Sequence, residues 1–116
     1  MSEVTLIPVF EVKAGRLEEF KVAAAALIER TDREPDTLRY DQHLSADGSR
    51  MVNIEVFRDA DAFVFHNRNV ADLVPALTDA GPLVHIDVIG DVNDDLRAEL
   101  ANVDVTYLSP LGSIDR

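Results

Sequence analysis

The chain has 116 residues, 47% of them hydrophobic, which predicts one folded domain spanning residues 1–116. Its 22 acidic and 11 basic side chains give a formal net charge of −11, so we expect no nucleic-acid partner and no binding to anionic membranes. The absence of cysteine excludes disulfides, thiolate nucleophiles and the commoner structural zinc sites. The sequence shows neither a signal peptide nor a long apolar run, and we therefore expect a cytoplasmic protein.

The first part of the chain predicts a strand and then a long helix. Val4–Val12 is rich in β-branched residues, and Pro8 within it cannot donate to a ladder. Pro8 should therefore lie at an edge or a bulge, or point its missing N–H into a cavity. Apolar residues then recur at helical spacing, and Pro35 ends the helix. The recurring residues are Leu17, Phe20, Ala24, Leu27 and Ile28.

Two strands joined by a turn at Asp47-Gly48 are predicted next, at residues 37–45 and 50–57. Their register decides which side chains share a face of the sheet. A three-residue loop with Gly48 in the left-handed conformation would place the opposite charges of Arg39 and Glu55 across from each other.

A two-residue turn gives the alternative register. It brings the polar residues of the first of these strands onto the face of Val52, Ile54 and Val56, where we expect helices to bury them at a cost. The three-residue loop avoids this burial, so we predict its register, with Asp41 opposite Asn53. The polar surface that it predicts comprises Arg39, Asp41, His43, Asn53 and Glu55.

The stretch from Asn53 to His66 joins this strand to a short helix. Alternation along the strand gives one apolar face and one face that carries an amide and a carboxylate, which indicates a lined cavity. Asp59 stands where a helix N-cap accepts backbone N–H bonds, and Asp61 adds negative charge in the first turn. The predicted helix ends at the histidine.

The last third of the chain predicts a helix, a strand, a short helix and a strand. The first helix begins at about Asp72 and stops at Gly81-Pro82. Leu83–Ile89 alternates apolar and polar residues as a strand does, and Asp91–Asp95 supplies caps for the short helix. The final strand is expected at residues 103–108.

The order strand, helix, strand, strand, helix, strand is the ferredoxin-like split motif, an α+β fold with helices on one face of an antiparallel sheet. We assign residues 4–89 to this core and residues 91–109 to an extension associated with a dimer. The uncovered sheet face should be the one that mixes apolar and polar side chains, too apolar for water and too polar for a dry core. Two copies packing sheet to sheet would enclose it, so we expect a homodimer.

Three segments carry a family resemblance: Lys13–Phe20, Glu34–His43 and Glu55–His66. They resemble the antibiotic biosynthesis monooxygenase domain family of dimeric α/β barrels, and the resemblance covers Val4 to about Ile89. It implies a homodimer with a pocket in each half of the barrel. The scaffold serves several chemistries, among them cofactor-free quinone-forming oxygenation, haem degradation and small-molecule isomerisation.

Residue by residue, the resemblance carries over in part. Quinone-forming members have a third-strand asparagine, matched by Asn53, but Phe57 stands where they have tryptophan and Phe63 where they have a helix tyrosine. Haem-degrading members rely on an Asn, Trp and His set. Here Pro8 replaces the first-strand asparagine and the chain has no tryptophan, so we do not expect haem degradation.

Cofactor-free oxygenation requires a dry pocket, a base, and a hydrogen bond to the substrate anion. We predict that Asn53 bonds a substrate oxygen and that His66, His85 or a desolvated Glu55 takes the proton; Glu55 and His66 also match the broad family pattern. Tyr40 is interpreted as a packing residue. The expected substrate contacts are Arg39, His43, Met51, Phe57 and Phe63.

The predicted function is oxidation of a small aromatic phenol or quinol to a quinone without a cofactor. An isomerase would use the same base and the same donor, so the sequence leaves both reactions open. A third reading is a dimer that binds a ligand without turnover, which the missing pocket Trp and Tyr favour. The three histidines lack the spacing of a metal site, and we expect neither metal nor haem as a required cofactor.

Overall fold

The computed structural model describes residues 2–116 of the chain. Every strand and helix predicted from the sequence is present, and most bounds agree within two residues. The helix predicted to end at His66 was too short, because α2 continues for three residues to Asn69. The elements are β1 (Val4–Glu11), α1 (Leu17–Thr31), β2 (Thr37–Leu44), β3 (Arg50–Phe57), α2 (Ala60–Asn69), α3 (Val74–Ala80), β4 (Leu83–Gly90), α4 (Asp94–Glu99) and β5 (Val105–Leu108).

Side-chain caps fix the starts of two helices. Asp59 has an extended backbone and its carboxylate accepts the N–H of Ala62 at 2.9 Å, so α2 begins where the sequence predicts. Asn93 caps α4 in the same way by accepting the N–H of Leu96. Pro75 lies in the first turn of α3, where its missing N–H leaves no helical bond unmade.

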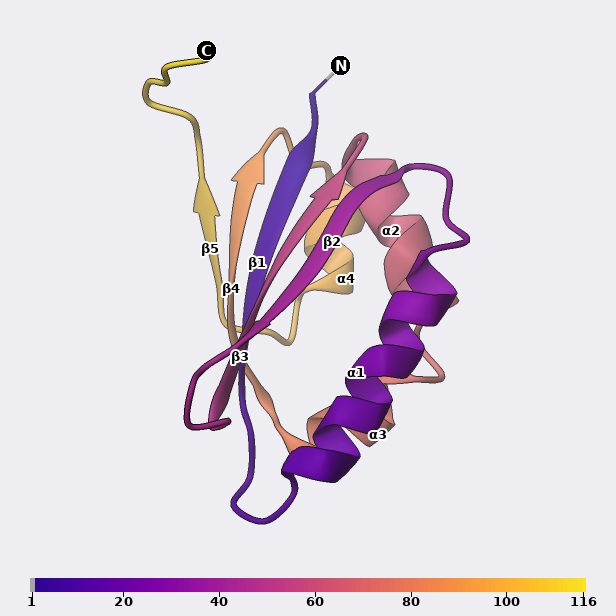
Figure 1. The fold of residues 1–116 in the computed structure, drawn as a ribbon. Coiled ribbons are helices and arrows are strands. Elements are labelled where there is room, and N and C mark those ends of the chain that lie inside the picture. Colours follow the sequence, from indigo (N-terminus) through magenta and orange to yellow (C-terminus); the bar gives the residue numbers. More distant parts are fainter. Residues whose placement is uncertain (1) are drawn as a thin grey trace.

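The five strands form one sheet in the order β2-β3-β1-β4-β5. All neighbouring pairs are antiparallel except β4 and β5, which are parallel. Figure 1 shows the four helices on one face of this sheet and the opposite face uncovered. The α+β, ferredoxin-like arrangement is therefore confirmed, with β5 added at one edge.

The helices cover the face of the sheet that we expected to be open. On β3 the buried residues are the mixed set that includes Asn53 and Glu55, whereas Val52, Ile54 and Val56 lie half-buried on the uncovered face. The prediction was wrong because it assigned the purely apolar face to the helices. Polar groups of the helix layer meet Asn53 and Glu55 inside the protein, so the mixed face does not need a second copy to cover it.

The predicted hairpin register was also wrong. Tyr40 pairs with Glu55 and Arg39 with Val56, which is the alternative register that we rejected. Its polar residues are not buried under helices, because that face is open. Gly48 does adopt the left-handed conformation, with φ 74°, in a loop closed by the bond from the Ser45 N–H to the Arg50 carbonyl.

Pro8 lies in the central strand and not at an edge. The ladder between β1 and β3 is interrupted at Ile7 and Pro8, between the pairs that Leu6 and Val9 make. Pro8 is buried on the helix-covered face, where it lines an internal cavity. The predicted edge position was therefore wrong, and the residue lines the cavity from the central strand.

Two apolar clusters fill the space between sheet and helices. One packs α2 and α4 on the sheet around Phe57 and Phe63, and the other packs α1 and α3 around Phe10 and Phe20. On β3 the two clusters are separated by two polar positions, since Met51 belongs to the second cluster and Phe57 to the first. The polar residues at that seam form the candidate site.

The uncovered sheet face is a continuous, largely apolar surface in the single chain. Its apolar centre consists of Thr5, Ile7 and Val9 on β1, Val52, Ile54 and Val56 on β3, and Ile89 on β4. Among residues 2–116, no helix has the length and apolar character needed to cross a lipid bilayer.

Candidate active site

Four polar side chains are buried at the seam between the two apolar clusters. Glu34, Asn53, Glu55 and His66 expose 6%, 1%, 6% and 4% of their surface. Burial of this kind is costly unless each group finds a partner, so the contacts among the four decide what the site can do.

His66 is held by Glu34. The histidine faces inward from α2, and its Nδ1 lies 2.9 Å from Glu34 Oε1 and 3.0 Å from Oε2. Because a carboxylate only accepts, Nδ1 carries the hydrogen. Thr37 and Asn69 donate to the same carboxylate at 2.6 and 2.9 Å. Glu34 therefore fixes the imidazole in the tautomer that leaves Nε2 available for proton transfer.

Glu55 lies on the other side of the imidazole. Its Oε1 is 4.0 Å from His66 Nε2, and its Oε2 accepts from Asn53 Nδ2 at 3.2 Å. One histidine thus stands between two buried carboxyl groups, one in direct hydrogen-bond contact and one slightly farther away. A shift of about 1 Å would bring the second within hydrogen-bond distance of Nε2.

The two carboxyl groups differ in pKa. For Glu34, burial acts to raise the pKa, but the hydrogen bonds from His66, Asn69 and Thr37 outweigh it and hold the pKa below its ordinary value. For Glu55, burial dominates and raises the pKa, with His66 and Asn53 opposing it only in part. One carboxylate is therefore a fixed anion, and the other is a group that readily holds a proton.

An internal cavity of about 210 Å³ adjoins this pair. Glu55, His66 and Tyr40 form its polar end, and the Tyr40 and His66 rings are 5.3 Å apart. Its walls come from both apolar clusters and include Leu6, Phe10, Leu27, Phe63, Val70 and Leu77. An acid–base pair at the end of an apolar cavity is typical of an active site.

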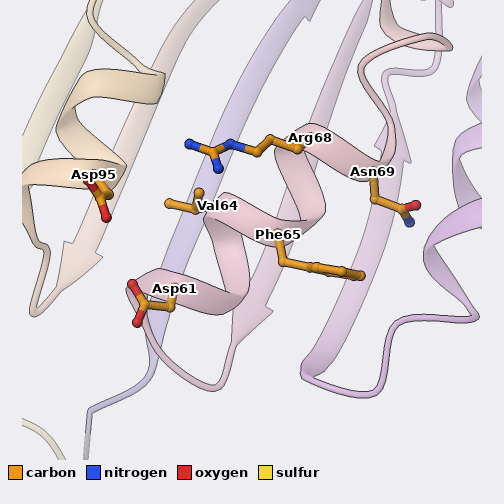
Figure 2. A pocket seen from close by; sticks show the side chains of 6 residues that line it. All are labelled: Asp61, Val64, Phe65, Arg68, Asn69 and Asp95. Carbon is orange, nitrogen blue, oxygen red and sulfur yellow. The ribbon is translucent and has the colours of Figure 1, made fainter.

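A larger hollow lies on the outside of α2 and is not the site. Figure 2 shows it between α2 and α4, with Asp61, Phe65 and Arg68 along the helix and Asp95 opposite. Its volume is about 600 Å³, but it opens widely to solvent and Phe65 is 58% exposed. None of the four buried polar side chains lines this hollow, so it lacks the buried acid–base groups of the candidate site.

Three of the predicted catalytic residues come together and one does not. Asn53, Glu55 and His66 are neighbours at the seam. Asn53 stands behind Glu55 and does not line the cavity; its Oδ1 is buried without a hydrogen-bond partner. His85 lies on the opposite face of the sheet.

The predicted substrate contacts divide in the same way. Phe57 and Phe63 pack beside His66, with ring centroids 5.1 and 6.4 Å from the imidazole, and Phe63 lines the cavity. Met51 is buried on the same side of the sheet but outside the cavity. Arg39 and His43 lie on the open face.

The open face holds its own charged groups. Arg39 pairs with Asp41. His85 bonds Asp87 through Nε2 and Asp104 through Nδ1, both at 2.8 Å, and these two bonds raise the pKa of the imidazole above its ordinary value. His85 is therefore a solvent-accessible, carboxylate-paired histidine, and it does not reach the buried site.

Sequence reasoning missed Glu34 and misjudged Tyr40. Glu34 follows α1 in a loop, where an acidic residue is ordinarily a solvated one. The only signal was its position next to Pro35 in one of the segments that carry the family resemblance. Tyr40 was interpreted as a packing residue, but it is the cross-strand partner of Glu55 and lines the cavity.

The described residues offer no ready metal site. Nowhere in residues 2–116 do three or more His, Asp or Glu side chains gather with the geometry to hold a metal ion. Glu34, His66 and Glu55 instead form a line in which the imidazole bridges two carboxyl groups, an arrangement suited to moving protons.

Comparisons with known proteins agree with this fold. The sequence model of antibiotic biosynthesis monooxygenases matches residues 4–72, more than half of the chain. The chain belongs to this family. Glu34, Asn53, Glu55 and His66 all lie within the matched segment, so the buried site is part of the family domain. No curated protein matches the chain.

Solved structures resemble the chain over most of its length. MupZ from Pseudomonas fluorescens is 28% identical, with a TM-score of 0.87 over 98% of this chain and 94% of that one. SnoaB from Streptomyces nogalater, a cofactor-independent oxygenase, is 26% identical, with a TM-score of 0.63 over 76% and 91%. Rv0793 from Mycobacterium tuberculosis is 21% identical, with a TM-score of 0.69 over 79% and 97%, and shares the fold.

Proposed function

We propose that this protein is a cofactor-independent monooxygenase that oxidises a small aromatic phenol or quinol to a quinone in the internal cavity. The observation that carries the proposal is one histidine held between two buried carboxyl groups at the end of an apolar cavity. Family membership and the likeness to SnoaB support oxygen as the second substrate.

His66 is the proposed base. Its Nε2 faces Glu55 beside the cavity, and Glu34 on Nδ1 stabilises the imidazolium that forms when Nε2 takes a proton. Glu55 can then receive that proton, because its raised pKa makes it a ready carrier. Asn53 is proposed to act through Glu55, whose carboxylate it holds, and Phe63 to contact the substrate ring.

The chemistry balances without a redox cofactor. The base removes a proton from the phenol or from an acidic ring C–H, and the electron-rich anion reduces dioxygen. One oxygen atom is added to a ring carbon, so that a phenol gives a quinone and a quinol gives a hydroxyquinone. The other oxygen atom leaves as water with the two hydrogens that the substrate loses. The protein supplies the base, the orientation of the substrate and the exclusion of solvent.

The size of the cavity limits the substrate. A cavity of about 150 Å³ is known to hold benzene. The 210 Å³ available here therefore fits one ring or two fused rings with small substituents. We propose a mono- or bicyclic substrate and not an extended polycyclic one.

A proton-transfer isomerase is the second candidate. The observation that favours it is the difference between the two carboxyl groups. With Glu34 ionised on one side of His66 and Glu55 inclined to hold a proton on the other, the site contains both a base and an acid. Removing a proton beside a carbonyl and returning it elsewhere requires only these two groups.

Oxygen consumption tests the monooxygenase proposal. We expect the purified protein, with no metal or cofactor added, to speed oxygen uptake with naphthalene diols or substituted hydroquinones well above the uncatalysed rate. Mass spectrometry should then detect one ¹⁸O atom per quinone from ¹⁸O₂. If no compound of the panel raises oxygen uptake, the monooxygenase proposal fails. Deuterium exchange into a bicyclic ketone at unchanged oxygen level would then favour the isomerase.

We also propose that two copies of the chain pack through the uncovered sheet face. That face presents a block of apolar side chains from β1 and β3 that no helix covers, as Figure 1 shows. A contiguous apolar surface of this kind marks a contact surface. β5 pairs with β4 inside the same sheet, so it would meet the second copy at the sheet edge.

Replacing Ile54 by lysine should dissociate this dimer. Ile54 lies on the uncovered face opposite Asp41, whose carboxylate already bonds Arg39. Burying an added ammonium there in the contact between two copies would cost several kcal/mol. Light scattering should show wild type at twice the 12.8 kDa of one chain and the variant at 12.8 kDa. Val22→Lys is the control, since Val22 is 73% exposed on α1, and it should remain dimeric. A monomeric wild type would refute the proposal.

A further inference from the structure

Tyr40 belongs to β2 and faces the candidate site from the sheet. It is the cross-strand partner of Glu55, so both side chains stand on the helix-covered face. Its ring centroid is 5.3 Å from that of His66, with the rings tilted by 51°, and all three residues line the same 210 Å³ cavity. A group bound next to His66 Nε2 therefore lies within reach of Tyr40 as well.

The cavity is poor in free hydrogen-bond donors. Asn67 already donates to Glu99 at 2.9 Å, Thr78 donates to the carbonyl of Val74 at 3.2 Å, and the Nδ1 hydrogen of His66 is committed to Glu34. The glutamates accept when they are ionised. No side-chain hydrogen bond found among the described residues has the Tyr40 hydroxyl as its donor, and its contact with Gln42 acts to lower its pKa, as a bond received by the oxygen does. Its proton is therefore available to a ligand.

The electrostatic surroundings keep that hydroxyl protonated. Burial raises the pKa of Tyr40 far above its ordinary value, and the nearby charge of Glu55 raises it further, with Gln42 opposing this only in part. A tyrosine in such a place does not act as a base. It stays a neutral O–H donor.

We infer that Tyr40 is a catalytic residue that donates a hydrogen bond to the substrate oxygen on which negative charge develops. The inference deepens the proposed function, because that reaction and its isomerase alternative both need one base and one oxyanion donor in one cavity. The donor role was predicted for Asn53, but Asn53 is already bonded to Glu55 and does not line the cavity.

The donor and the base act on the same event. The substrate proton moves to His66 Nε2, its bonding electrons stay on the substrate, and the charge is delocalised onto the ring oxygen. The Tyr40 O–H bond to that oxygen strengthens as the charge grows, while the tyrosine keeps its proton. Loss of a donor of this kind typically lowers kcat by about 10²–10³-fold.

A pair of matched ligands separates this role from simple packing. 1-Indanone and indane have the same two-ring frame, and only 1-indanone carries an oxygen that accepts a hydrogen bond. NMR titration of wild type should show tighter binding of 1-indanone. In Tyr40→Phe, which keeps the ring, we expect the affinity for 1-indanone to fall by about tenfold and that for indane to stay unchanged. In an active preparation, kcat for oxygen uptake should fall with it.

Tyr107→Phe is the control, since the chain has two tyrosines and Tyr107 lies on β5 under Arg97, away from the cavity. It should bind both ligands as wild type does. The inference is overturned if wild type does not bind 1-indanone, does not prefer it to indane, or keeps its preference in Tyr40→Phe. Equal losses for both ligands would likewise mean packing alone. Because binding is measured without turnover, failure of the monooxygenase proposal would appear separately, as absent oxygen uptake with the 1-indanone preference intact.

Discussion

Replacing His66 by alanine is expected to lower kcat for oxygen uptake by about 10²–10⁴-fold, the usual contribution of a positioned base. The rise of rate with pH that accompanies deprotonation of the base should disappear with it. Oxygen-electrode measurements at a saturating quinol concentration between pH 5 and 9 test both statements. Phe65→Ala is the matched control, because Phe65 precedes His66 on α2 and is 58% exposed.

Glu34→Gln should show that the carboxylate and the imidazole work as one unit. Glutamine keeps the shape of Glu34 but removes the charge that stabilises the imidazolium and selects the Nδ1–H tautomer. We expect a large loss in kcat with little change in KM. The double variant Glu34→Gln, His66→Ala should be no slower than His66→Ala alone, since groups that act together give non-additive losses. Additive losses would show that Glu34 serves some other purpose.

The secondary structure could be predicted because its signals are local. The Asp59 cap, the left-handed Gly48 and the first-turn Pro75 each act within a few residues, and the structure has each of them where the sequence places it. Alternation along the strands was equally clear. Local signals of this kind also sufficed for the order of the elements and hence for the ferredoxin-like arrangement.

The faces of the sheet could not be predicted, because alternation says that two faces differ and not which one the helices cover. Both faces of β3 carry apolar residues, and the rule that polar groups avoid a helix layer pointed to the wrong one. The choice of face depends on contacts between residues far apart in the sequence. Glu34 and His66 come from other elements, and their contacts keep the polar groups of β3 inside the protein. The hairpin register was wrong for the same reason, since it was chosen to keep charges away from helices that lie on the other side.

The site was recovered in part. Asn53, Glu55 and His66 were identified because polar residues in otherwise apolar segments are visible in a sequence. His85 and His43 met the same criterion but lie on the open face. The sequence alone does not say which polar side chains are buried. Glu34 is a loop residue whose importance arises only from the 2.9 Å contact with a histidine 32 residues later.

The two buried glutamates should affect stability in opposite directions. Glu34 is ionised and accepts hydrogen bonds from three side chains, so Glu34→Gln should lower the free energy of unfolding at pH 8 by about 2–3 kcal/mol. Glu55 is buried with one weak partner, and burial of its charge is unfavourable. Glu55→Gln should therefore raise the free energy of unfolding at pH 8, by about 1–3 kcal/mol. Such a gain from removing a site residue is the signature of a group kept for function.

Both effects should shrink as the pH falls, and the sign follows from the pKa shifts. The pKa of Glu34 is below its ordinary value of 4.5 in the folded protein, so its contribution is present above that value and is lost as the pH falls through the folded pKa. The pKa of Glu55 is raised, so wild type is penalised only once the pH exceeds 4.5, when the unfolded chain releases a proton that the folded protein retains. Urea unfolding at pH 3, pH 5 and pH 8 measures this: the Glu55 effect should shrink between pH 8 and pH 5, and the Glu34 effect between pH 5 and pH 3. Glu18→Gln, exposed on α1, is the neutral control. Destabilisation by Glu55→Gln at pH 8 would show that Glu55 stabilises the fold as an anion, and it would remove the argument that its carboxyl group holds a proton for His66.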